Sequence, residues 1–390
     1  MKKILLFIVL AQFFCTSVWF AGNSIISDIS KALHLDPAFL GHITSAIQFG
    51  FISGTLVFAI LSIADRFSPS KVFFVSALLA GLFNLGIIIP GVAGTEILLF
   101  RFLTGFFLAG IYPVGMKIAS DYFQTGLGKS LGFLVGALVI GTAFPHLIKD
   151  ITSTLPWKYV VYITTLLSAA GGLMIVLFVP DGPYHKPGSK IQLTAFLRGF
   201  SNRDFRSVSF GYFGHMWELY TFWAFLPVML ATYNTLNTET NLNVPLFSFL
   251  VIAAGGPACV LGGLLSQKFG AKNIAAIALA ISCSCCILSP IFLFSHSSFA
   301  FLIFLFVWSV SVIADSPLFS TLVAKNAPEE TRGTSLTIVN CIGFSITIIS
   351  IQCINILLTK LSPQYVYMFL AIGPILGLLA LFKKEFNVTK

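Results

Sequence analysis

Long apolar runs, separated by short polar segments, follow one another along almost the whole chain. Most of the runs reach the length of about 20 residues that an α-helix needs to cross the hydrocarbon core of a bilayer. The pattern therefore predicts an all-α membrane protein with twelve transmembrane helices. To within a few residues, the runs, numbered 1 to 12 in chain order, cover 4–27, 42–63, 71–90, 96–120, 127–148, 157–180, 206–233, 245–266, 273–294, 298–323, 333–358 and 364–382.

The longest polar segment between runs covers 181–205 and divides them into two groups of six. Short basic loops at 64–71 and 263–272 occupy the same place in each group, which indicates an internal repeat of the kind that transporters carry. We expect one six-helix bundle in residues 1–180, a cytoplasmic linker in 181–205 and a second six-helix bundle in 206–390.

The positions of Lys and Arg give an independent check on the number of helices. If the N-terminus is cytoplasmic and every run crosses, 17 of the 23 Lys and Arg residues lie in cytoplasmic segments and 4 in outer segments. This asymmetry follows the positive-inside rule, so we expect both termini in the cytoplasm and, as the location, a bacterial inner membrane. The net charge of +9 then implies no nucleic-acid partner. Met1-Lys2-Lys3 begins a run that continues to about Ile26, which predicts a first transmembrane helix and not a cleaved signal peptide.

Composition excludes a soluble protein. The chain is 57% hydrophobic and 9% charged, with a mean hydropathy of +0.93, whereas soluble domains carry roughly 25% charged residues. No Gly-rich phosphate loop and no loop of nucleotide-domain size is present, so we expect neither an ATP-driven pump nor an enzyme, and no cofactor. The seven cysteines lie in apolar runs. Cys283, Cys285 and Cys286 predict small apolar filler and no metal site, with a reactive role as the alternative.

Several motifs resemble those of the major facilitator superfamily across nearly the whole chain. The loop after run 2 keeps Asp65, Arg66 and Lys71, with Leu61 and Ser68 where the family usually has glycines. Its second-half copy has Gln267 in place of the aspartate and keeps Gly263, Leu265, Lys268, Gly270 and Lys272. Run 4 and two helix starts also match, through Arg101, Gly105, Ala109, Gly110 and Pro113, through Trp157-Lys158 and through Arg332-Gly333.

The resemblance implies two six-helix bundles that rock about a central cavity lined mainly by runs 1, 4, 7 and 10. It further implies that Asp65, with Arg66, forms a gate latch that holds the outward-open state against the facing end of run 11. The glycine-proline signature of antiporters in run 5 is not matched, because Pro145 is isolated.

Ionisable side chains inside the runs are informative, because placing one at the centre of a membrane helix costs about 2.5–3.5 kcal/mol on insertion scales. Glu218 lies about 18 Å along run 7, near the expected midplane, and His215 is one turn before it. A carboxyl group beside an imidazole can exchange a proton, so this pair predicts a proton-coupling site. A structural hydrogen bond to a neighbouring helix is the alternative for Glu218.

Asp315 in run 10 shares a helix face with Trp308 and Ser311. It is a candidate second proton site or part of the inner gate, or else it satisfies backbone donors at a helix break before Pro317. Arg101, on one face with Tyr112, is a candidate for proton coupling or for binding an anionic solute through its planar guanidinium, with an ion pair to run 1 or 7 as the alternative. For Lys117, pairing with Asp121 at the membrane edge is favoured over substrate binding.

Run 1 carries polar side chains at helical spacing, which line the cavity or form hydrogen bonds between helices. An aromatic-rich segment of run 7 either stacks on a planar or cationic solute or simply packs. The candidate substrate-binding residues are therefore Gln12, Thr16, Trp19, Asn23, Arg101, Tyr112, Trp217 and Trp308.

These features predict a secondary active transporter that moves a small polar solute, with an anion as one option. Coupling to a proton or another ion, as a symporter, is expected, and so is a monomer. The alternatives are a uniporter or exporter without a proton step and a transporter-like sensor without flux.

Overall fold

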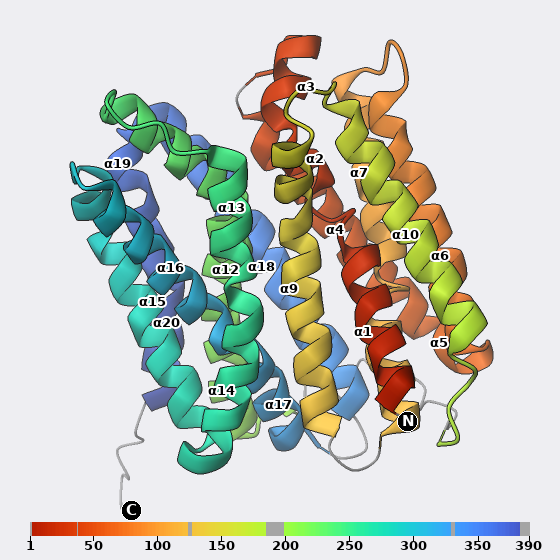
Figure 1. Cartoon of the computed structure of the whole chain (residues 1–390). Helices are drawn as coiled ribbons and strands as arrows, with labels where there is room; N and C mark the ends of the chain where they lie inside the picture. The colour runs from red at the N-terminus through yellow and green to blue at the C-terminus, as the bar shows by residue number, and fades with distance from the viewer. Residues whose placement is uncertain (1, 37, 124–126, 185–198, 329–331, 383–390) are drawn as a thin grey trace, which may run out of the picture.

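The computed structural model of the chain describes residues 2–36, 38–123, 127–184, 199–328 and 332–382. Within these ranges every regular element is a helix, so the all-α prediction is confirmed (Figure 1). The first part of the chain contains α1 (Lys2–Thr16), α2 (Ala21–Ser24), α3 (Ile26–Leu33), α4 (Phe39–Ile60), α5 (Ile63–Arg66), α6 (Pro69–Asn84), η1 (Leu85–Ile88), α7 (Gly94–Leu108), α8 (Tyr112–Tyr122), α9 (Leu127–Ile151) and α10 (Lys158–Phe178).

The second part of the chain is also built of helices connected by short segments. It contains α12 (Arg203–Leu236), α13 (Val244–Ala253), α14 (Gly255–Phe269), α15 (Ala271–Leu293), α16 (Ser298–Ala314), α17 (Ser316–Asn326), α18 (Arg332–Lys360), α19 (Pro363–Val366), η3 (Tyr367–Ala371) and α20 (Ile372–Phe382).

Among the described residues, ten helical segments are long and apolar enough to cross a membrane. They correspond to ten of the twelve predicted runs. Run 7 is α12, which has 34 residues and so a length of about 51 Å, but carries His215 and Glu218 in its apolar surface. Run 1 is divided among α1, α2 and α3. Runs 1 and 7 are therefore the two that are not long or apolar enough to be counted. They are also two of the runs in which we predicted polar residues of the transport site.

The helices of the first part, α1 to α10, pack mainly on one another, and so do α12 to α20. We call these the N-terminal and C-terminal groups. They meet where α4 lies against α18 and where α9 lies against α13 and α14 (Figure 1). Of the predicted linker 181–205, residues 185–198 lie outside the described part of the chain, so the domain boundaries stay a prediction.

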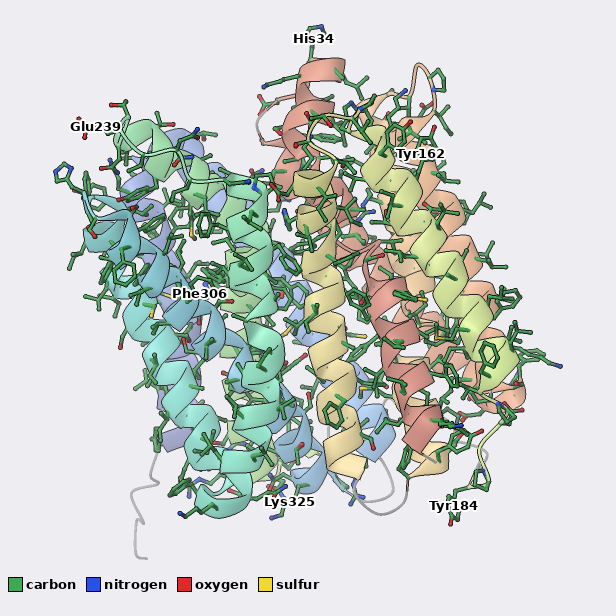
Figure 2. All side chains as sticks on the ribbon, in the orientation of Figure 1. His34, Tyr162, Tyr184, Glu239, Phe306 and Lys325 are labelled. Carbon is green, nitrogen blue, oxygen red and sulfur yellow. The ribbon has the colours of Figure 1, made fainter. Side chains whose placement is uncertain are left out.

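The first residues of α1 and the last of α20 lie at the same end of the molecule, which we call the termini end (Figure 1). Lys325 and Tyr184 lie at this end, whereas His34 and Glu239 lie at the opposite end (Figure 2). The cytoplasmic placement of the termini end stays a prediction from the charge count.

Run 1 is not the single helix that its apolar pattern predicts. It breaks between Thr16 and Ala21, where the Thr16 hydroxyl donates to the Gln12 carbonyl at 2.8 Å and the chain turns. Run 4 breaks between α7 and α8, run 8 between α13 and α14, and run 10 between α16 and α17. Each break leaves backbone carbonyls or amides without their helical partners, which a membrane interior tolerates only where protein or water satisfies them.

Glycine brings α4 and α7 into direct backbone contact. A Cβ atom at Gly105 would collide with the carbonyl of Ile47, and one at Gly50 with the carbonyl of Phe102. Small residues permit such close approach between membrane helices. This contact explains why run 4 keeps Gly105 four residues after Arg101.

Candidate transport site

A cavity of about 380 Å³ lies between the two groups of helices. Its walls come from α8 and α9 of the N-terminal group and from α12, α16, α17 and α18 of the C-terminal group. No described lining residue carries a charge. The lining residues are Tyr112, Met116, Leu131, Gly132, Val135, Leu138, Tyr212, Met216, Leu219, Tyr220, Trp223, Ile313, Ser316, Pro317, Ser320, Thr321, Ala324, Leu336, Asn340 and Phe344.

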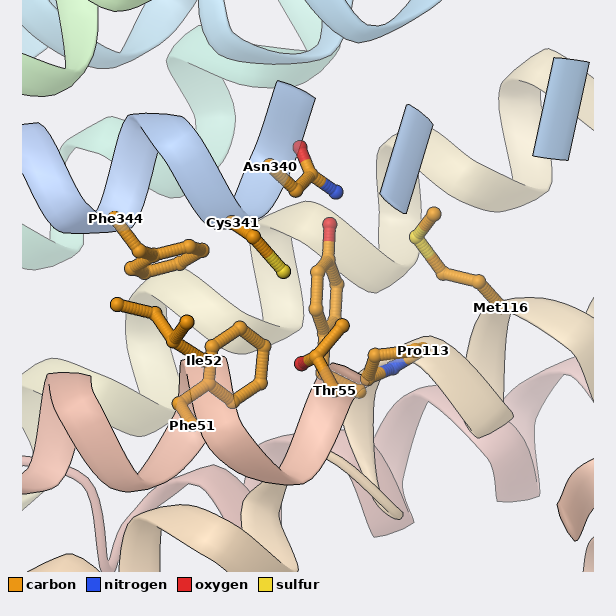
Figure 3. Close-up of a pocket in the computed structure, with 9 residues that line it drawn as sticks. Phe51, Ile52, Thr55, Pro113, Met116, Asn340, Cys341 and Phe344 are labelled. Atoms are coloured by element: carbon orange, nitrogen blue, oxygen red, sulfur yellow. The ribbon is translucent and has the colours of Figure 1, made fainter. Parts of the chain in front are cut away.

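A smaller cavity of about 50 Å³ adjoins the first at α4, α8 and α18. In Figure 3, Asn340, Cys341 and Phe344 of α18 face Phe51 and Ile52 of α4. Asn340 and Phe344 line both cavities, so α18 forms a wall common to the two.

The large cavity extends toward the termini end, because Leu131, Ala324 and Leu336 lie close to helix ends on that side. Its other limit is an aromatic cluster built from both groups. Trp19 stacks on Tyr220 with 5.8 Å between ring centroids, and Phe51 meets Phe344 at 4.8 Å. Such ring pairs exclude water and add to the stability gained from burial alone.

Neutral hydrogen bonds join the two groups at the opposite end. Gln352 Nε2 donates to Ser45 Oγ at 2.7 Å and to the Gly41 carbonyl at 3.0 Å. Asn355 Nδ2 donates to the carbonyl of Ala38 at 2.8 Å. The structure is therefore closed at the opposite end, while its cavity reaches toward the termini end.

Glu218 is fully buried inside the C-terminal group, behind the cavity wall. Trp308 Nε1 donates to Oε1 at 2.6 Å, Cys286 Sγ donates to the same oxygen at 3.2 Å, and Ser282 Oγ donates to Oε2 at 2.8 Å. These donors come from α15 and α16, so Glu218 ties three helices together. The expected interhelical hydrogen bond is present, and Trp308 is a partner of Glu218 and does not line the cavity.

The contact with Cys286 also corrects the interpretation of the cysteine cluster as filler without a carboxylate nearby. Spacing within run 9 could not show this, because Glu218 reaches the thiol from α12. No group of three or more His, Cys, Asp or Glu suited to a metal ion occurs among the described residues.

His215 and Asp315 form a second buried polar contact in the C-terminal group. His215 Nδ1 lies 2.8 Å from Asp315 Oδ1, and the two side chains are 0% and 1% exposed. Asp315 is the residue at which α16 ends and α17 begins, but its side chain accepts no capping hydrogen bond from α17. The helix break expected at Asp315 is present. Its carboxylate, however, contacts the imidazole of His215 and does not satisfy backbone donors of α17.

The three titratable side chains lie close together. Glu218 is one turn from His215 on α12, and Asp315 contacts His215 from the break between α16 and α17. His215 lies with its ring centroid 6.0 Å from those of Tyr212 and Phe319. Because Tyr212 lines the cavity, the imidazole is separated from the cavity by one layer of side chains.

Arg101 is fully buried in the N-terminal group and makes no ion pair with a described residue. Its Nη1 donates to the Val18 carbonyl at 3.0 Å and to Asn84 Oδ1 at 3.1 Å, and its Nη2 donates to the Trp19 carbonyl. The guanidinium therefore satisfies carbonyls that the break in run 1 leaves without helical partners. The ion pair that we gave as an alternative is replaced by these backbone contacts.

The polar residues of run 1 lie between helices and do not line either cavity. Asn23 Nδ2 donates to Thr44 Oγ1 at 2.7 Å, and Gln12 Oε1 lies against Gly115 of α8. Trp19 belongs to the aromatic cluster. Trp217 lies on the far side of α12, where Nε1 donates to the Phe369 carbonyl at 3.3 Å. Of the predicted substrate-binding residues, only Tyr112 lines the cavity.

The predicted gate latch lies at the termini end. Asp65 forms an ion pair with Lys117 of α8, with 2.7 Å between Oδ1 and Nζ, and Arg66 is exposed. Asp65 and Lys117 line a cavity of about 140 Å³ together with Thr337 of α18. The loop thus lies across from run 11, as the latch requires, but in this state Asp65 pairs within its own group.

Several residues of the site carried no signal strong enough to predict them. Asn340 is one amide in an apolar run, and Tyr212 is one of many aromatic residues in run 7. His146, an ionisable residue within run 5, was also missed; it is buried in α9 and lines neither cavity. An inventory of every titratable side chain in the runs, including histidine, would have found it.

The sequence matches the family model of the Major Facilitator Superfamily over residues 8–351. The chain belongs to this superfamily, and it is a multi-pass membrane protein that acts as a secondary transporter and not as an enzyme. The resemblance stated from the motifs is thereby confirmed.

Solved structures are similar in fold to this chain. The nucleoside transporter NupG matches with a TM-score of 0.74 and 16% identity over 97% of this chain and 100% of that one. A bacterial homologue of the human lysosomal transporter Spinster, in an inward-facing and unoccupied conformation, matches with a TM-score of 0.67 and 14% identity over 97% and 94%. None of the curated proteins compared with the sequence matches it.

Proposed function

We propose that the chain is a proton-coupled symporter that moves a small polar solute by alternating access between its two groups of helices. The observation that carries this proposal is the buried contact between His215 and Asp315, placed directly behind the cavity wall. Two charges in a low-dielectric interior are tolerated when paired, and both of these groups can gain or lose a proton. A proton taken up here would weaken the attraction between α12 and the break in run 10.

The break connects that event to the cavity. Asp315 is followed at once by Ser316 and Pro317, and these residues, with Ser320 one turn later, line the cavity from α17. A change in the contact between Asp315 and His215 would therefore act on the wall that faces the solute. Glu218 is the second proton acceptor, held by three donors and one turn along α12 from His215.

An uncharged solute fits the cavity better than an anion. The described lining carries no charge, and a buried ion without a counter-charge is costly. Arg101, the residue that favoured an anion, donates to backbone carbonyls of run 1 and lines neither cavity. Its proposed role is accordingly to hold the break in run 1 in place.

The remaining expectations are proposals of the same kind. The count of Lys and Arg supports termini in the cytoplasm of a bacterial cell and makes the present state inward-facing. We propose that Asp65 exchanges its Lys117 partner for α18 when the termini end closes, which is the latch role expected for Asp65 and Arg66. A monomer suffices, because both walls of the cavity come from one chain.

The test separates coupling from movement of the solute. A thermal-shift screen of metabolites identifies a solute, and proteoliposomes then report uphill uptake under a proton gradient and counterflow at equal pH. We expect Asp315→Asn and Glu218→Gln to lose uphill uptake by tenfold or more while counterflow stays within about threefold. Glu239→Gln, a change of an exposed carboxylate at the opposite end, is the control and should leave both rates unchanged.

The alternatives predict other outcomes. Wild-type uptake that a protonophore does not affect would favour a uniporter or exporter without a proton step. Absence of any flux from a folded, solute-binding protein would favour a sensor. Wild-type uphill uptake in both acidic variants would show that these carboxylates do not couple.

A further inference from the structure

Besides the hydroxyl of Ser316 and the sealed indole of Trp223, four polar side chains of the large cavity make no hydrogen bond to any described residue. They are the amide of Asn340 on α18 and the hydroxyls of Tyr112 on α8 and of Tyr212 and Tyr220 on α12. Their polar atoms keep accessible surface, unlike the sealed hydroxyls of Tyr233 and Tyr367 elsewhere in the bundle. A polar group in a membrane interior is costly to leave unpaired, so these groups are available to a solute.

The four side chains come from both groups of helices and converge. Tyr212 and Tyr220 lie on α12, and Tyr112 lines the same cavity from α8 of the other group. Asn340 lines both the large and the small cavity, and so does Phe344, one turn along α18 (Figure 3). We call these four side chains the polar edge of the cavity; Ser320 and Thr321 also line the cavity, but their hydroxyls donate to backbone carbonyls of α17.

Flat rings surround this edge. Tyr220 lies with its centroid 5.3 Å from those of both Phe344 and Trp223, and Met116 and Met216 complete the wall. Aromatic faces bind flat rings by offset or edge-to-face contact, and methionine adapts to their outline. A hydroxyl-rich, puckered sugar would leave many of its polar groups unpaired against such a lining.

Asparagine presents a donor and an acceptor side by side in one plane. This arrangement pairs in a bidentate manner with a heterocycle that carries an acceptor next to a donor, as asparagine does with a base edge. We propose that Asn340, supported by the three tyrosine hydroxyls, determines specificity for an uncharged, flat heterocyclic solute with adjacent donor and acceptor groups. The inference rests on the proposed function only in placing the solute in this cavity.

The test is binding to the purified protein by isothermal titration, without a proton gradient. Uracil and 9-methyladenine are the probes, 1,3-dimethyluracil and N6,N6,9-trimethyladenine are their donor-blocked matches, and orotate and glucose test charge and shape. We expect at least one unblocked heterocycle to bind, and its blocked match, orotate and glucose to bind at least tenfold more weakly.

Variants then locate the recognition. Asn340→Leu, which keeps the size of the side chain, should weaken binding of the heterocycle by about tenfold or more, and Tyr220→Phe by a few-fold. Asn340→Asp keeps the shape without the N–H donors and should also weaken binding, which guards against a folding defect in the leucine variant. Asn326→Leu is the matched control, because Asn326 is half-buried on neighbouring α17, bonds to the Leu322 carbonyl at 2.8 Å and does not line the cavity.

Three results would overturn the inference: no binding of either heterocycle to the folded protein, tighter binding of orotate or glucose, or wild-type affinity in folded Asn340→Leu and Asn340→Asp. Because binding is measured at equilibrium, these results are independent of coupling. A protein that couples protons but ignores both heterocycles would contradict this inference alone, and one that binds them without proton coupling would contradict the proposed function alone.

Discussion

The two groups of helices bury opposite charges in different ways. In the N-terminal group, Arg101 donates to the fixed carbonyls of Val18 and Trp19 and to Asn84. In the C-terminal group, Glu218 and Asp315 contact side chains, which can rotate or change protonation. Neither group leaves its buried charge without partners, as the low dielectric of the interior requires.

The difference separates a structural charge from charges that can switch. A guanidinium does not lose its proton in proteins, and a backbone carbonyl cannot move away without moving the helix. A carboxyl group beside an imidazole can change its charge, and hydroxyl, thiol and indole donors can adjust to either form. We therefore propose that Arg101 holds the geometry of run 1 and that the C-terminal group carries proton coupling.

The largest effect is expected for Arg101→Met, which would leave three acceptors unpaired. The free energy of unfolding should fall by about 3–9 kcal/mol, since each of the three buried unpaired acceptors costs about 1–3 kcal/mol. The thermal midpoint in detergent measures this loss, with exposed Arg332→Met as the control. A variant with the wild-type midpoint that fails only in transport would make Arg101 a functional charge and break the comparison.

A smaller loss is expected for His215→Leu, which leaves Asp315 buried without its partner. We expect a fall in unfolding free energy of about 2–3 kcal/mol, below the full cost of an isolated charge because Asp315 can take up a proton. Adding Asp315→Asn in the same chain should recover part of the loss. Strictly additive losses in the double variant would indicate that the two side chains do not interact.

Glu218→Gln should change the unfolding free energy by about 1 kcal/mol or less. The amide oxygen can accept from Trp308, and Ser282, which also donates to the Leu279 carbonyl at 3.1 Å, can accept from the amide nitrogen. Chemical unfolding of the purified variant, beside its uphill uptake, distinguishes a coupling role from a structural one. A loss above about 3 kcal/mol would place Glu218 in the same structural class as Arg101.

The smallest effect concerns the joint between the groups. Gln352→Leu removes two neutral hydrogen bonds at the opposite end, so the balance between states should shift by about 1–2 kcal/mol toward opening there. Double electron–electron resonance between spin labels at His34 and Glu239 should then report longer distances, with Asn273→Leu at the termini end as the control. Unchanged distances would mean that the closure does not depend on Gln352, since Asn355 and the aromatic cluster still join the two groups.

Much of the fold was predictable, because apolar length and charge asymmetry are properties of the chain itself. The breaks in the helices were not predictable, and they alter which residues line the cavity. The polar stripe from Gln12 to Asn23 was derived for one straight helix, whereas run 1 turns after Thr16. Trp308 and Trp217 were predicted to line the cavity from their spacing along the helix. The same spacing also occurs on a helix face that contacts another helix or lipid, and these two side chains bond to neighbouring helices.

The sequence by itself determined that the chain crosses a membrane many times, that it belongs among the major facilitators, and that Arg101, Glu218 and Asp315 need partners, because burying charge in hydrocarbon is costly wherever it occurs. Only the tertiary structure decided which partners they have. Cys286 reaches Glu218 across 68 positions of sequence, and Asn340 reaches the cavity with its amide unpaired. Contacts between distant helices depend on packing and on breaks in the spans, and neither is contained in the pattern of any single run.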